Sequence, residues 1–272
     1  MDHKVFQEFR EIIHRESGIN LSEEKRPLLS NRIAKRIRNL GLKDEADYLR
    51  HVREDKDGEE LVELLDAIST NVTYFYREDE HFKILSDIFL SWKEGNKRRV
   101  RIWCAAASSG EEPYTLAITA AEKLDLAKID YRFLATDICT QVLNHGANGI
   151  YDEKQFKQMP NAIKTKYFTR TKGRTESAVS WQASPALREQ ITFKRLNLAQ
   201  FPYPLKGPLD VIFCRNVMIY FDNQLRQKIV HEFERLLAPG GYLFVSRSEN
   251  LLGLQTELKS IGTSVYQKGK VG

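Results

Sequence analysis

An alternation of strand-like and helix-like segments after residue 96 restricts the fold more than any other feature of this chain. Four short, β-rich apolar runs occur there, RRVRIWCAA, DYRFLATD, LDVIFCRN and GGYLFVSRS. Helical patterns such as PYTLAITAAEKL and NQLRQKIVHEFERLL separate them. Strands that alternate with helices predict a mostly parallel sheet with helices on both faces.

Before residue 70 the pattern is helical throughout. VFQEFREIIHR places Phe6, Phe9, Ile12 and Ile13 at helical spacing, and three further amphipathic segments follow. We expect Gly41 to be the C-cap of the first of these three. We therefore predict a helical domain over 1–69, a linker and connecting helix over 70–95, and the sheet domain over 96–272.

The stretch from about 154 to 192 interrupts the alternation. KYFTRT and AVSWQA have the pattern of a short hairpin, with Lys172 and Gly173 near its turn. We expect a small antiparallel β-subdomain inserted into the sheet domain.

Composition excludes several classes of protein. With 42% hydrophobic and 29% charged residues, the 272-residue chain has the composition of a globular protein. No apolar run approaches the ~18 residues of a membrane span, and the charged start lacks the apolar centre of a signal peptide, so we expect a cytoplasmic address. We also expect a monomer. A net charge of +5 permits an acidic partner without requiring nucleic acid, which we do not expect. Cys104, Cys139 and Cys214 are scattered, which predicts buried thiols and no metal site.

The carboxyl ends of parallel strands are where such sheets bind ligands. The first strand runs into small residues through Gly110, which leaves room for close approach, and the second ends at Asp137, which suits two ribose hydroxyls. We expect further cavity residues at Arg215 and Asn216, which end the third strand, and at Asn197 and Leu198, which offer an amide and an apolar wall to a purine.

The loop after the first strand lacks the GxGxxG pattern of a dinucleotide site. It carries Glu111 and Glu112, which would repel a pyrophosphate but suit a cation. S-adenosylmethionine fits, since it has an adenine, a ribose, a sulfonium and an ammonium but no phosphate. Each feature also has a structural alternative: the alanines as helix–sheet packing, the Glu-Glu-Pro as complement to a helix dipole, and Arg215 as a surface charge.

Five stretches together resemble one family. TNVTYFYR, AAASSGEEPY, TDICTQVLNHGANGIY, FCRNVMIYFD and LFVSRSEN occur in the order and spacing of the CheR chemotaxis-receptor methyltransferases, which are S-adenosylmethionine-dependent protein-glutamate O-methyltransferases. The resemblance implies a Rossmann-like methyltransferase domain with an inserted antiparallel β-subdomain, preceded by an all-α domain. It also implies a methyl-accepting receptor as the partner.

The resemblance implies a role for each matching residue. Asn71, Thr73 and Arg77 would reach over the cofactor, and Ala106 and one of the two acids, preferably Glu112, would line its methionine end. Asp137 would hold the ribose, with Asn197 and Leu198 near the adenine. Arg215 and Asn216 would lie at the next strand end, and Tyr220 would lie near the transferred methyl.

A glutamate substrate with a pKa near ~4.3 is already ionised at neutral pH, so no general base is needed. Arg77 would then orient that carboxylate or, alternatively, pair with Glu111 or Glu112 and brace the linker. Tyr220 would steer the carboxylate or pack against the sulfonium.

A basic face on the second helix carries Arg32, Lys35, Arg36 and Arg38. It is either a solvated surface or, as the resemblance implies, the docking face for the cytoplasmic helical region of a receptor. Two alternative functions stay open: a methyltransferase of the same fold with another substrate, and a non-catalytic adaptor that binds cofactor or receptor.

Overall fold

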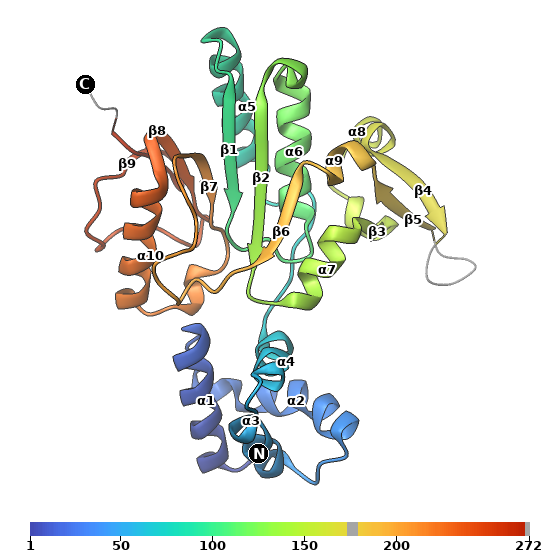
Figure 1. The fold of residues 1–272 in the computed structure, drawn as a ribbon, viewed down its shortest axis with the longest axis vertical. Helices are drawn as coiled ribbons and strands as arrows, with labels where there is room; N and C mark the ends of the chain where they lie inside the picture. The colour runs from blue at the N-terminus through green and yellow to red at the C-terminus, as the bar shows by residue number, and fades with distance from the viewer. Residues whose placement is uncertain (173–178, 270–272) are drawn as a thin grey trace.

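The computed structural model describes residues 1–172 and 179–269, and it divides into a helical part and a sheet part (Figure 1). The helical part contains α1 (His3–Ser17), η1 (Glu23–Lys25), α2 (Arg26–Leu40), α3 (Glu45–Glu54) and α4 (Glu59–Ile68). Their apolar stripes meet in a core that includes Phe6, Phe9 and Tyr48. Gly41 ends α2 in the left-handed conformation, at φ 67°, as the sequence predicts.

The sheet part is built on seven strands. In spatial order they are β6 (Ile191–Arg195), β2 (Asp130–Asp137), β1 (Arg99–Cys104), β7 (Leu209–Phe213), β8 (Leu237–Phe244), β10 (Val265–Gln267) and β9 (Lys259–Gly262). The neighbouring strands β6, β2, β1, β7 and β8 are parallel to one another, and β10 is antiparallel to both of its neighbours. The four predicted strands are present, whereas β6, β9 and β10 were not predicted.

Alternate side chains of the central strands enter two different cores. On β1, Ile102 packs in a core with residues of α5 (Glu80–Glu94) and α6 (Glu111–Lys123). Trp103, the next residue, packs in a second core with residues of α10 (Asn223–Leu236). A period of two along a strand therefore places helices on both faces of the sheet, as predicted. A further helix, α7 (Thr140–Asn148), lies against β2 and β6.

The small sheet contains β3 (Ile150–Asp152), β5 (Val179–Ala183) and β4 (Phe168–Lys172), all antiparallel, in that order. The predicted hairpin is present as β4 and β5, but β3 was not predicted and precedes the expected start of the insertion. Gly173, expected near the turn, lies outside the described residues. The remaining short elements are η2 (Leu126–Lys128), η3 (Glu153–Phe156), α8 (Asn161–Tyr167), α9 (Pro185–Arg188) and η4 (Met218–Tyr220).

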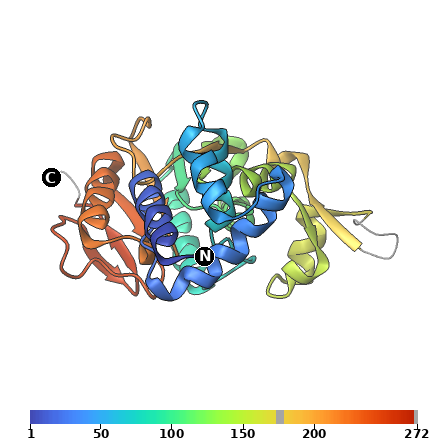
Figure 2. The same ribbon diagram turned by 90° about the horizontal axis from the view of Figure 1, so that it is seen from below.

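The order of the strands reverses between β1 and β7, because the chain adds β2 and β6 on one side of β1 and then β7 and β8 on the other. The carboxyl ends of these strands face the helical domain, which lies across that edge of the sheet (Figures 1 and 2). A ligand cleft is expected at such a reversal. Among the described residues, no helix combines the length and apolar character that a membrane span requires.

Candidate active site

A cavity of about 800 Å³, open to solvent, lies where β1, β2 and β7 end. Its walls contain the following predicted residues: Asn71, Thr73, Arg77, Ala106, Glu112, Asp137, Asn197, Leu198, Arg215, Asn216 and Tyr220. The helical domain contributes Ser17 and Ile19, which were not predicted.

The small-residue loop after β1 both packs and opens the cavity. Ala107 is fully buried in the protein, whereas Ala105 and Ala106 line the cavity. The loop turns into α6 at Gly110, whose φ of 99° favours glycine. A Cβ at this position would also lie 2.6 Å from Tyr151 Oη and 2.8 Å from Gly146 Cα. The glycine is therefore required by conformation and by contact.

The Asp137 carboxylate ends β2 at the cavity wall. It accepts hydrogen bonds from the backbone N–H of Ser108 (2.8 Å) and of Cys139 (3.0 Å). Burial raises the pKa of Asp137, and these backbone hydrogen bonds oppose the rise. Because an ionised carboxylate offers about four acceptor positions, Asp137 keeps capacity for hydroxyl groups in the cavity.

The two acids that begin α6 point to different places. Glu112 lines the cavity, accepts from Arg215 Nη1 at 2.6 Å, and accepts from the thiol of Cys104 at 3.2 Å. Burial raises the pKa of Glu112, an effect that the Arg215 charge opposes. Glu111 instead accepts from Ser109 Oγ (2.6 Å) and from Gln155 Nε2 (2.7 Å). The structure thus brings Glu112 to the cavity and not Glu111.

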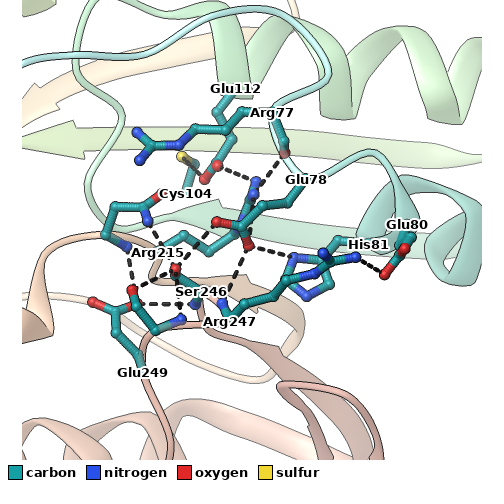
Figure 3. Close-up of polar contacts among 12 residues, drawn as sticks. Arg77, Glu78, Glu80, His81, Cys104, Glu112, Arg215, Ser246, Arg247 and Glu249 are labelled. Atoms are coloured by element: carbon teal, nitrogen blue, oxygen red, sulfur yellow. Dashed lines mark hydrogen bonds and ion pairs between the residues drawn. The ribbon is translucent and has the colours of Figure 1, made fainter.

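Arg215 is a buried cation, only 3% exposed, and not a surface charge. Besides Glu112, its Nη2 donates to the Arg77 carbonyl at 2.6 Å and lies 3.2 Å from Glu78 (Figure 3). Asn216 follows at φ 58° and donates to Ser246 Oγ at 2.8 Å. The guanidinium therefore joins the end of β7 to α6 and to the linker.

A carboxylate that was not predicted fixes the loop after β7. Glu249 is buried and accepts hydrogen bonds from the backbone N–H of Asn216, Val217 and Ser246, each at 2.9 Å. Glu249 lies in the quoted stretch LFVSRSEN, so a motif signal existed, but no spacing rule indicated its role.

The linker covers the cavity from the other side. Asn71 accepts from Ser108 Oγ at 3.0 Å through its carbonyl, and Thr73 lines the cavity. Arg77 Nη1 donates to the Val72 carbonyl at 2.7 Å, and its guanidinium lies 5.8 Å from the Tyr74 ring centroid. Within the described part of the chain, Arg77 forms no ion pair with Glu111 or Glu112. Arg77 therefore braces the linker by a hydrogen bond to the backbone of the linker itself.

Two predicted residues also hold the helical domain in place. The Asn197 side chain donates to the Glu16 carbonyl at 2.5 Å and accepts from Ala199 N–H at 2.9 Å. The Tyr220 carbonyl accepts from Asn20 N–H at 2.9 Å, while the Tyr220 side chain lines the cavity. The amide expected to meet a purine is thus already engaged in the domain contact, and Leu198 beside it supplies an apolar wall.

The four basic residues of α2 are not equivalent. Arg32 Nη1 donates to the carbonyls of Ile68 and Ser69, both at 2.6 Å, at the end of α4. Arg36 pairs with the buried Glu60, with Nε–Oε1 at 2.9 Å. Lys35 and Arg38 are exposed. Two of the predicted docking residues are therefore part of internal contacts, and two are accessible.

Comparison with known proteins shows the family to which this chain belongs. The model of the "CheR methyltransferase, all-alpha domain" matches residues 4–69, and that of the "CheR methyltransferase, SAM binding domain" matches residues 71–267. The chain belongs to the CheR methyltransferase family. Chemotaxis protein methyltransferase 2 of Pseudomonas aeruginosa is 37% identical over 96% of this chain and 91% of its own length. The chemotaxis protein methyltransferases of Escherichia coli and Salmonella typhimurium are 37% and 38% identical over 97% of this chain, and over 91% and 90% of theirs.

Membership makes the protein an S-adenosylmethionine-dependent methyltransferase, and the cavity fits that CheR cofactor. Asp137 keeps free acceptor capacity at the wall, and the loop after β1 brings short residues to the cavity, Ala105, Ala106 and Ser108. Glu112 provides a carboxylate for the positively charged end, and no phosphate-binding glycine pattern is present.

Proposed function

We propose that this CheR protein transfers the methyl group of S-adenosylmethionine to glutamate side chains in the cytoplasmic helical region of methyl-accepting chemotaxis receptors. The observation that carries the proposal is that both family domains match, over residues 4–69 and 71–267, and that the relatives covered almost end to end are named chemotaxis protein methyltransferases. We propose a cytoplasmic monomer that acts without nucleic acid.

When bound, the cofactor would supply a methyl group on a positively charged sulfur, and this sulfur would keep the electron pair of the C–S bond as the methyl passes to a carboxylate oxygen of the substrate. The protein's part is alignment, which contributes about 7–11 kcal/mol in favourable cases. Asp137 and Leu198 hold the nucleoside end, and Glu112 holds the cationic end. No side chain has to remove a proton, because the glutamate is ionised at neutral pH.

Arg77 and Tyr220 are our candidates for contact with the substrate carboxylate. A guanidinium has five N–H donors, and Arg77 uses one of them in its hydrogen bond to the Val72 carbonyl. Two of the other N–H groups can therefore donate to the two oxygens of a carboxylate. Tyr220 is partly exposed at the cavity wall and presents a hydroxyl or a ring face there.

For receptor docking we propose Lys35 and Arg38, the accessible members of the basic face. An acidic receptor helix would meet them by complementary charge. Reversing both to glutamate is expected to raise the KM for receptor and leave the cofactor Kd unchanged. Loss of cofactor binding in that variant would refute the docking role.

The deciding experiment is incubation of the protein with tritiated cofactor and purified receptor cytoplasmic fragments, followed by mapping of alkali-labile label. Glutamate methyl esters release methanol in mild alkali, whereas N-methyl groups do not. Alkali-stable label would indicate another substrate. Tight cofactor binding without any label would indicate an adaptor.

A further inference from the structure

The linker enters the site through a turn of unusual backbone conformation. Tyr76 (φ 59°) and Glu78 (φ 55°) both lie in the left-handed region, on either side of Arg77. Residues other than glycine rarely adopt this conformation, which is strained and persists where the surroundings enforce it. We call residues 76–78 the linker turn.

Glu78 is the residue through which the surroundings hold this turn. Its carboxylate lies 3.2 Å from Arg215 Nη2, accepts from Ser246 Oγ at 3.1 Å, and accepts from the backbone N–H of Arg247 at 3.3 Å (Figure 3). These partners stand at the ends of β7 and β8. Arg215 also holds the Arg77 carbonyl, so one guanidinium fixes two consecutive residues of the linker turn.

The same guanidinium reaches the cavity. Arg215 Nη1 donates to Glu112 at 2.6 Å, so the partly buried Glu78 and the buried Arg215 and Glu112 form a continuous chain of charge. Burial raises the pKa of Glu78, but the Arg215 charge and the hydrogen bonds from Arg247 and Ser246 outweigh this and hold it below its ordinary value. When Glu78 and Glu112 are both ionised, the chain carries two negative charges against one positive charge.

We infer that Glu78 is a positioning residue with two effects on methyl transfer: it holds Arg77 at the cavity through the linker turn, and it shares the charge of Arg215 so that Glu112 stays available to a cation. Without Glu78, Arg215 is balanced by Glu112 alone, and the chain becomes neutral. Glu78 does not line the cavity itself, so it acts through Arg215.

The charge argument predicts a signature that a purely structural role does not share. S-adenosylmethionine and S-adenosylhomocysteine differ by the positive charge on sulfur. A neutral Glu78→Gln variant should therefore bind the methylated form about tenfold more weakly, as expected for one charge removed at short range in a protein interior. The demethylated form should lose clearly less, so that the ratio of the two dissociation constants changes.

The experiment compares wild type, Glu78→Gln, Glu78→Gly and Glu80→Gln. Glycine accepts the left-handed backbone but has no carboxylate, so Glu78→Gly separates relief of strain from loss of charge. Glu80→Gln is the matched control, because Glu80 is an exposed glutamate of the same segment that pairs with Arg247 at the surface. Calorimetry gives the two dissociation constants, and thermal unfolding gives stability.

Both Glu78 variants are expected to shift the ratio of dissociation constants and to lower kcat for receptor methylation at least tenfold, and Glu80→Gln to match wild type. A wild-type ratio in Glu78→Gln overturns the inference, as does activity that simply follows melting temperature across the variants. The kcat part rests on the proposed function, but the affinity ratio does not. If the wild-type protein binds cofactor but methylates no receptor, only the kcat part is refuted, and the affinity ratio still tests the inference.

Discussion

The Asp137 carboxylate sits between two demands, since it is buried by the fold and yet needed as an acceptor in the cavity. Replacing it with asparagine removes the buried charge and keeps an oxygen for one of the two backbone N–H groups that it binds. Hydrogen bonds to charged groups contribute about 1.5–3 kcal/mol. We expect Asp137→Asn to weaken cofactor binding about 10- to 100-fold. Calorimetry tests this, with Asp130→Asn, at the exposed end of the same strand, as control.

At Glu60, burial raises the carboxyl pKa, but the hydrogen bonds from Arg36 and Tyr48 lower it more, so the folded-state pKa lies below the ordinary value. The unfolded chain therefore binds more protons in the interval between the two values, and stability rises with pH there. The contribution is complete above the ordinary pKa of about 4.3 and is lost as pH falls through the lowered value.

We expect Glu60→Gln to lower the free energy of unfolding by about 1.5–3 kcal/mol at pH 7, with the difference from wild type shrinking below about pH 4.5. Urea titrations followed by circular dichroism at pH 7, 5 and 4 measure it. The exposed neighbour Glu59→Gln should show little effect at any pH. A difference for Glu60→Gln that grows as the pH falls would contradict the sign.

The sequence pattern predicted Arg36 and Arg32 as members of a basic face but could not show their use. Their partners come from α4 and from Ser69 directly after it, about 24 to 37 residues away in the chain. Helical periodicity reports which side of a helix a residue occupies, and it carries no information about which distant acceptors meet that side. Asp137, by contrast, was predictable because a strand end fixes its position. The pattern left both Glu111 and Glu112 as candidates, and only the family resemblance favoured Glu112.

Among the elements, Gly110 joins β1, α6, α7 and the small sheet at one point. Gly110→Ala should cost about 1–2 kcal/mol for the left-handed backbone and about 1–3 kcal/mol more for the clash with Tyr151 and Gly146. Gly58→Ala is the matched control, since its φ of 73° is also left-handed but nothing lies within 4 Å of the added Cβ. Equal losses in the two variants, measured by chemical denaturation, would show that the contact is unimportant.

The elements that escaped prediction share a physical cause. β6 and β9 lie at the two edges of the sheet, and β9 is exposed along its whole length, so neither has the apolar run of a central strand. β3 and β10 have three residues each. The central strands, buried on both faces, were found because burial forces continuous apolar sequence.

In the whole molecule, the two domains meet along two seams with the cavity between them. On one side, the end of α1 bonds to the loops after β6 and β7 through Asn197 and Tyr220. On the other, Asp66 of α4 accepts from the backbone N–H of Thr140 (3.0 Å) and of Gln141 (3.2 Å), and so caps α7 from the neighbouring domain. Because Ser17 and Ile19 line the cavity, cofactor binding and domain docking should support each other.

Asp66→Ala tests that coupling at a residue outside the cavity. Loss of this helix cap should cost about 0.5–2 kcal/mol, loosen the seam, and weaken cofactor binding several-fold. Saturation at about 100 times Kd adds about 2.7 kcal/mol to whatever state binds, so calorimetric scans should show cofactor restoring cooperative unfolding of the two domains in the variant. The exposed Asp57→Ala should leave both properties unchanged. Unaltered cofactor affinity in a destabilised Asp66→Ala would mean that domain docking and cofactor binding are not coupled. It would also mean that the cavity lining formed by Ser17 and Ile19 adds nothing to cofactor affinity.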